Sequence, residues 1–71
     1  MAREWMKEAR EKSGKTQREA ATALNISESY YCEIENGNRM PRLDLRFADD
    51  LSKLFKVPLK RILDAESNVS V

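Results

Sequence analysis

The residue types that most often carry out chemistry in proteins are scarce in this sequence. Its 71 residues include one cysteine, Cys32, and no histidine. A single cysteine excludes an internal disulfide framework, and the lack of histidine removes the commonest metal ligand and general base. No nucleophile is paired with a base. We therefore expect that the protein is not an enzyme and that it uses no metal, cofactor or small-molecule ligand.

The stretch from Thr16 to Gly37 carries the start and stop signals of two short helices joined by a tight turn. Thr16 and Glu19 match a capping box, in which each side chain accepts a hydrogen bond from the backbone N–H of the other residue. Asn25 tolerates the left-handed conformation that ends the first helix, Ser27 caps the second helix, and Gly37 ends it. This pattern predicts a helix-turn-helix, which is typical of DNA-binding proteins.

Apolar residues at helical spacing predict three further helices around this pair. One covers residues 3–13 and ends at Gly14, one covers residues 43–55, and a short one begins near Pro58. From Ala65 onward we expect a frayed tail. The prediction is an all-α, compact five-helix domain over residues 1–66 with a flexible tail at 67–71. The side chains expected in its core are Trp5, Met6, Ala9, Ala20, Ala21, Leu24, Tyr31, Ile34, Phe47, Ala48, Leu51, Leu54, Phe55, Leu59, Ile62 and Leu63.

The formal net charge is only +1, and it is unevenly distributed. Residues 1–15 carry five lysines and arginines against three acids, residues 16–37 carry one against four, and residues 38–71 carry seven against five. The predicted helix pair is therefore acidic. Since neutralised phosphates supply much of the affinity of DNA complexes, the flanking segments must supply the cations. No apolar run approaches a membrane span or a signal peptide, so we expect a cytoplasmic protein with no membrane partner.

Five short helices with a helix-turn-helix as the second and third resemble the phage-repressor-like (XRE, or Cro-type) family of bacterial and phage transcription regulators. The resemblance covers residues 5–63 and implies that family's DNA-binding fold. Residues 51–63 look like the family's last two helices. The most specific carriers are Thr16-Gln17 with Glu19 and Ala21, the turn at Ile26-Ser27, and the run Ile34-Glu35-Asn36-Gly37 followed by Arg39 and Pro41.

The resemblance implies that the second helix of the pair enters the major groove with its N-terminus. Two roles are open for its outward glutamates, Glu28 and Glu33. Such a carboxylate accepts a hydrogen bond from a cytosine N4 group, or it points past the groove and discourages non-specific binding. Both interpretations stay open for Glu33, and the second is favoured for Glu28. A serine on this face reads almost any base edge and so carries little sequence information. The residues expected to face bases are Gln17, Glu28, Ser29, Cys32 and Glu33.

Phosphate contacts are implied for the residues around that helix. The family lays the loop after it along the sugar-phosphate backbone, which makes Arg39 and Arg42 the first candidates. Lys15 and Arg18 flank the start of the preceding helix and could reach the other side of the groove. The full set of expected phosphate-contacting residues is Lys15, Thr16, Arg18, Tyr30, Asn36, Asn38, Arg39 and Arg42.

Two further side chains match positions that the family pairs. An arginine from the first helix often meets the glutamate before Asn-Gly, which here are Arg10 and Glu35. Such a pair would be structural, because it would lock the first helix against the third. A redox-sensing role for Cys32 is disfavoured, since no lysine or arginine lies within one turn of it on the same helix to favour a reactive thiolate.

These expectations describe a sequence-specific regulator of transcription that binds double-stranded DNA. By the resemblance it would be a repressor, acting as a homodimer on an inverted-repeat operator with half-sites about one helical turn apart. The alternative is a protein-interaction module of the antitoxin or anti-repressor type, in which the same fold offers its acidic third helix to a basic protein partner.

Overall fold

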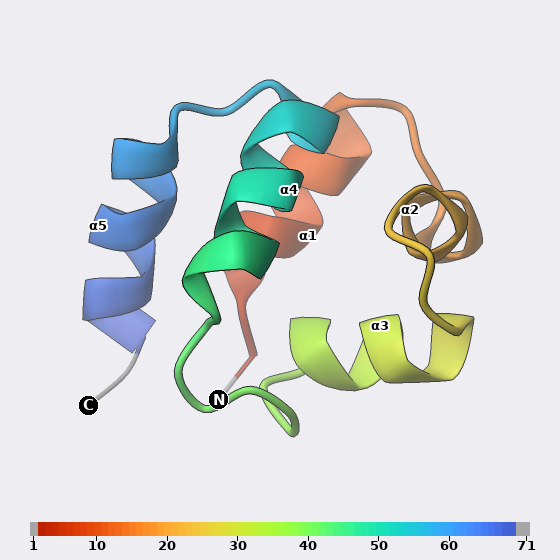
Figure 1. Ribbon diagram of the computed structural model, residues 1–71, viewed down its shortest axis with the longest axis horizontal. Helices are drawn as coiled ribbons and strands as arrows, with labels where there is room; N and C mark the ends of the chain where they lie inside the picture. Colours follow the sequence, from red (N-terminus) through yellow and green to blue (C-terminus); the bar gives the residue numbers. More distant parts are fainter. Residues whose placement is uncertain (1, 70–71) are drawn as a thin grey trace.

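The computed structural model describes residues 2–69, and the side chains of residues 2–67, as an arrangement of helices without strands (Figure 1). The helices are α1 (Glu4–Lys12), α2 (Gln17–Ala23), α3 (Glu28–Glu35), α4 (Leu45–Phe55) and α5 (Leu59–Val69). Helices α4 and α5 pack together, α2 packs on α3, and α1 bridges to α3. The predicted all-α five-helix fold is confirmed. In the part of the chain that the structure describes, no helix is long and apolar enough to span a membrane.

Local side-chain signals set the ends of α2 and α3. The Thr16 hydroxyl accepts from the Glu19 N–H at 3.1 Å, and the Thr16 N–H donates to Glu19 Oε1 at 2.8 Å, so the capping box is confirmed. Ser27 caps α3 through its hydroxyl. Asn25 (φ 61°) and Gly37 (φ 81°) adopt the left-handed conformation that ends each helix. These local signals mark the start and the end of each helix.

The core forms where α1, α3, α4 and α5 meet. Met6, Ile34 and Leu51 are fully buried there, and each such side chain contributes about 1.5–3 kcal/mol through its removal from water. On α2 the buried residues are Ala20 and Ala21. Their small side chains allow the backbone of α2 to lie close to α3.

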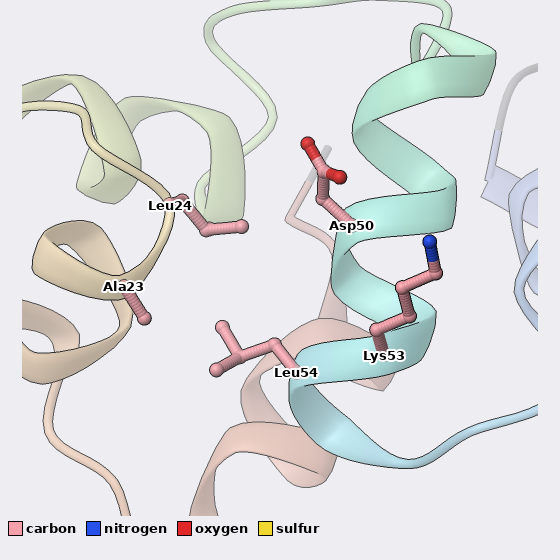
Figure 2. Close-up of a pocket in the computed structure, with 5 residues that line it drawn as sticks. All are labelled: Ala23, Leu24, Asp50, Lys53 and Leu54. Atoms are coloured by element: carbon pink, nitrogen blue, oxygen red, sulfur yellow. The ribbon is translucent and has the colours of Figure 1, made fainter.

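Helix α2 leaves an open pocket of about 360 Å³ toward α4. In Figure 2, Leu24 at the end of α2 and Leu54 on α4 point toward each other across this space, with Asp50 at its rim. Helix α2 is therefore held mainly through α3 and through the polar contacts described below.

Two expectations for the C-terminal helix were wrong. Helix α5 continues to Val69, whereas we expected the chain to fray from Ala65. Leu63 is 42% exposed, whereas we expected it in the core. The last turns of α5 bury Glu66, which accepts hydrogen bonds from other elements, so an apolar pattern gives no sign of them. Residues 70 and 71 of the expected tail lie outside the described residues. The other helices begin and end within two residues of the predicted bounds.

Candidate nucleic-acid interface

Helix α3 lies at the edge of the molecule, with one face buried and the other toward solvent (Figure 1). Tyr31, Ile34 and Glu35 form its buried face. The outward face carries the four α3 residues expected to meet bases. Of these, Glu28 and Ser29 are exposed, and Cys32 and Glu33 are half-buried.

The buried end of α3 is joined to α1 by an ion pair between Arg10 and Glu35. Arg10 Nε donates to Glu35 Oε2 at 3.0 Å, and Nη2 donates to Oε1 at 3.3 Å. The two side chains are only 12% and 5% exposed. The hydrogen bond to Glu35 raises the pKa of Arg10, so the arginine stays charged. Arg10 Nη1 also donates to the Lys15 carbonyl at 3.0 Å, which ties the chain just before α2 to the same pair.

Gln17 extends this ion pair to α2. Its Nε2 donates to Glu35 Oε1 at 3.2 Å, a contact that the sequence did not reveal. A side-chain amide has two N–H donors and a carbonyl acceptor, so the contact orients Gln17 while leaving it able to bind a further partner. The Tyr31 hydroxyl is buried beside this group, and burial together with the Glu35 charge raises the pKa of Tyr31. Helices α1, α2 and α3 thus meet at one buried carboxylate.

The solvent side of α3 carries a second ion pair. Arg39 Nε, from the loop after α3, donates to Glu33 Oε2 at 3.1 Å. The Arg39 guanidinium carbon lies 5.8 Å from the centre of the Tyr30 ring, within the range of a cation–π contact. Glu33 therefore does not present an uncompensated negative charge on the outward face, and Arg39 is held over the first turns of α3.

The remaining residues expected to contact phosphate lie around the start of α2 and just after α3 along the chain. Asn36 is exposed, and its Nδ2 lies 3.5 Å from Cys32 Sγ as a donor. Lys15 is half-buried, whereas the residues with exposed side chains are Thr16, Arg18, Asn38 and Arg42. The start of α2 and the loop after α3 thus carry exposed cations and amides.

The sequence of this chain matches the model of a known family, described as helix-turn-helix, over residues 6–62. The chain belongs to the XRE-type helix-turn-helix family. The matched segment contains most of α1, all of α2, α3 and α4, and the start of α5. The resemblance seen in the sequence is thereby confirmed.

A curated helix-turn-helix protein is similar to part of the chain. It is named as an uncharacterized HTH-type transcriptional regulator, YqaF, of Bacillus subtilis (strain 168), and it is 49% identical over 41 residues. Those residues are 58% of this chain and 54% of the relative, so the chain spans about half the length of that protein. No solved structure matches the chain.

Arg3 is the residue of this helix-turn-helix domain that sequence reasoning missed. It is 2% exposed, and its guanidinium donates to the carbonyls of Ile34 at 2.7 Å and Arg39 at 3.1 Å, and to that of Met40. Its Nε donates to Glu66 Oε2 at 2.9 Å. An arginine just before a helix looks like an ordinary surface charge in a sequence, and no periodic pattern identifies carbonyl partners more than 30 residues away.

Proposed function

We propose that this protein is a sequence-specific transcriptional regulator that binds double-stranded DNA with α3 in the major groove. The observation that carries the proposal is the polar outward face of α3, where Glu28 and Ser29 are exposed and the exposed Arg39 donates to Glu33. Arg18 on α2 and Arg42 in the loop after α3 are exposed as well. Base edges require hydrogen-bonding side chains of this kind, and phosphates require such cations on either side of them. The family and the printed name of the relative support a regulator and not an enzyme.

In this proposal Ser29, Cys32 and Glu33 face the bases together with Glu28. Gln17 at the start of α2 donates one amide hydrogen to Glu35, and in this proposal its remaining amide hydrogen meets a phosphate oxygen or a base edge. The helix N-terminus of α2 adds backbone N–H groups that favour an anion. Phosphate contacts come from the residues that border this face, namely Lys15, Thr16, Arg18, Tyr30, Asn36, Asn38, Arg39 and Arg42.

We further propose that the protein represses transcription as a homodimer bound to an inverted-repeat operator. A two-fold symmetric dimer places two copies of α3 in successive major grooves on one side of the duplex, about 34 Å apart. Occupying an operator in this way blocks other proteins from the same DNA, which is the simplest action open to a small DNA-binding domain.

Selection from a pool of randomised duplexes tests the proposal. We expect an enriched pair of inverted half-sites, whose spacing reports the dimer geometry. Titration of the selected duplex at about 50 and 200 mM salt should then give a steep salt dependence, since each phosphate contact contributes about −0.9 to the slope of log K against log salt. A pool that shows no enrichment, together with a flat salt response, would reject DNA binding.

The alternative of a protein-interaction module rests on one observation. The outward face of α3 carries Glu28 and Glu33, and the helix has no lysine or arginine of its own. An acidic helix of this kind suits a basic protein surface. The two functions differ in the titration with random duplex DNA, because a module of this type would hardly bind it at either salt concentration.

A further inference from the structure

Arg3 closes the C-terminal end of α3. The last carbonyls of an α-helix have no partner within the helix and carry the negative end of its dipole. Here the Arg3 backbone N–H donates to the Glu35 carbonyl at 2.8 Å, and its guanidinium Nη1 donates to the Ile34 carbonyl at 2.7 Å. One residue before α1 therefore supplies both a cation and two donors to the end of the outward-facing helix.

The same guanidinium holds the loop that follows α3. It donates to the carbonyls of Arg39 and Met40. Met40 has φ 52°, a left-handed conformation that side chains other than glycine adopt only when their surroundings impose it. The contacts from Arg3 are such surroundings, and they fix the backbone from which the Arg39 side chain extends.

Glu66 on α5 orients the guanidinium of Arg3. Its Oε2 accepts from Arg3 Nε at 2.9 Å and from Trp5 Nε1 at 2.8 Å. The side chains of Arg3 and Glu66 are 2% and 11% exposed, so each buried charge lies against an opposite one. Arg3 and Glu66 both lie outside the segment 6–62 that the family model matches. The Arg3–Glu66 contact thus joins the two segments that flank the matched domain.

We propose that Arg3, oriented by Glu66, is a positioning residue for DNA binding. It sets the backbone at Arg39 and Met40 and thereby places the Arg39 guanidinium beside α3. Helix α5 contributes to the interface in this way without touching DNA. The inference rests on the proposed DNA-binding function, but the hold on the loop is measurable without any DNA.

The first experiment measures the loop in the free protein. Arg3→Lys keeps the charge but loses the planar fork that serves several carbonyls, and Glu66→Gln keeps the shape but loses the charge. Ile62→Val is the matched control, because it trims a buried side chain on the same helix as Glu66. We expect backbone ¹⁵N order parameters at residues 39 and 40 to fall from about 0.85 toward 0.6 in the first two variants and to stay unchanged in the control. Unchanged values in both test variants would overturn the inference.

The second experiment measures binding to random duplex DNA, well below the melting temperature of every variant. Arg3→Lys and Glu66→Gln should bind several-fold more weakly, and their salt slope should be shallower by about one, the contribution of a single phosphate contact. In an Arg39→Ala background the same substitutions should have no further effect. Two outcomes would show that Arg3 is a purely structural residue. In one, the loss of affinity from Arg3→Lys or Glu66→Gln adds to the loss from Arg39→Ala. In the other, Ile62→Val causes the same loss of affinity at equal thermal stability.

Failure of the proposed function gives a different result. A wild-type protein that binds no duplex would remove the DNA role of Arg3 along with DNA binding itself. The order parameters would still report whether Arg3 holds the loop.

Discussion

Helix α3 takes part in two arginine–glutamate pairs that differ most in how deeply they are buried. Arg10 and Glu35 meet at 3.0 Å, and Arg39 and Glu33 meet at 3.1 Å. The first pair is 12% and 5% exposed, whereas the second is 56% and 40% exposed. The same chemical groups at the same distance therefore lie on opposite faces of one helix, one pair inside the protein and the other in water.

The depth of burial determines how much each pair contributes to stability. Breaking a buried pair leaves an uncompensated charge, which typically costs about 3–5 kcal/mol, whereas an exposed pair is worth about 0–1 kcal/mol. The Arg10–Glu35 pair therefore holds α3 in place. The Arg39–Glu33 pair is weak enough to be exchanged, and under the proposed function a phosphate oxygen would take the place of the Glu33 carboxylate in the complex with DNA.

The largest expected effect on stability comes from breaking the buried Arg10–Glu35 pair. Arg10→Met should lower the free energy of unfolding by about 3 kcal/mol, because Glu35 is left buried and without its cation. For a domain of this size that loss lowers the melting temperature by more than about 10 °C. Thermal unfolding followed by circular dichroism measures it. An unchanged midpoint would mean that the pair contributes nothing.

A double variant separates the pair from the packing around it. Arg10→Met with Glu35→Leu removes both charges together, so much of the lost stability should return. If the double variant were less stable than Arg10→Met by the full cost of a second disruption, the two residues would act independently and not as a pair.

Breaking the exposed Arg39–Glu33 pair should affect DNA binding more than the stability of the fold. Arg39→Gln should leave the free energy of unfolding within about 1 kcal/mol of wild type and reduce the salt slope of duplex binding by about one. Arg61→Gln is the matched control, since Arg61 is an exposed arginine on α5, away from α3. Equal losses of affinity in the two variants would show that only the net charge matters.

Removing the Glu33 carboxylate tests the other half of the exposed pair. Glu33→Gln frees Arg39 and removes a negative charge from the face proposed to approach DNA, so binding to random duplex should strengthen. Selection from a randomised pool with this variant also tests base reading. A lost preference for C·G pairs at one step would identify Glu33 as a cytosine contact, and an unchanged preference would reject that role.

The smallest effect is expected at the exposed capping box. Hydrogen bonds from Thr16 hold the pKa of Glu19 below its ordinary value of 4.5. A carboxylate with a lowered pKa in the folded state stabilises it above the unfolded pKa and loses that contribution as the pH falls through the folded pKa. Urea unfolding between about pH 6 and pH 3 should thus show a slightly shallower pH dependence for Glu19→Gln than for wild type. Superimposable profiles would exclude a role for Glu19 in acid sensitivity.

The sequence predicted what depends on near neighbours in the chain. Thr16 with Glu19, and Asn25 with Ser27, act over two or three residues, so their types alone located the turn. The pairing of Arg10 with Glu35 was expected only from the family resemblance, because their positions 25 residues apart carry no local signal.

The contacts that the sequence did not predict join distant elements through polar side chains. Gln17 meets Glu35 across 18 residues, and Arg3 meets Glu66 across 63. Hydrophobic periodicity shows which face of a helix is buried but not which charged side chain finds a partner there. For the same reason the last turns of α5, which Glu66 anchors, were mistaken for a tail.

The contact between Arg3 and Glu66 also orders events during synthesis. A ribosome makes the chain from its N-terminus, so Arg3, the helix pair and the loop all emerge before Glu66 exists. The contact is one of the most non-local in the described chain, and non-local contacts form late in folding. The helix pair can therefore form first, and the loop beside it reaches its final position only after α5 has been made. Under the further inference, a nascent chain that still lacks α5 would therefore lack the contact that positions Arg39.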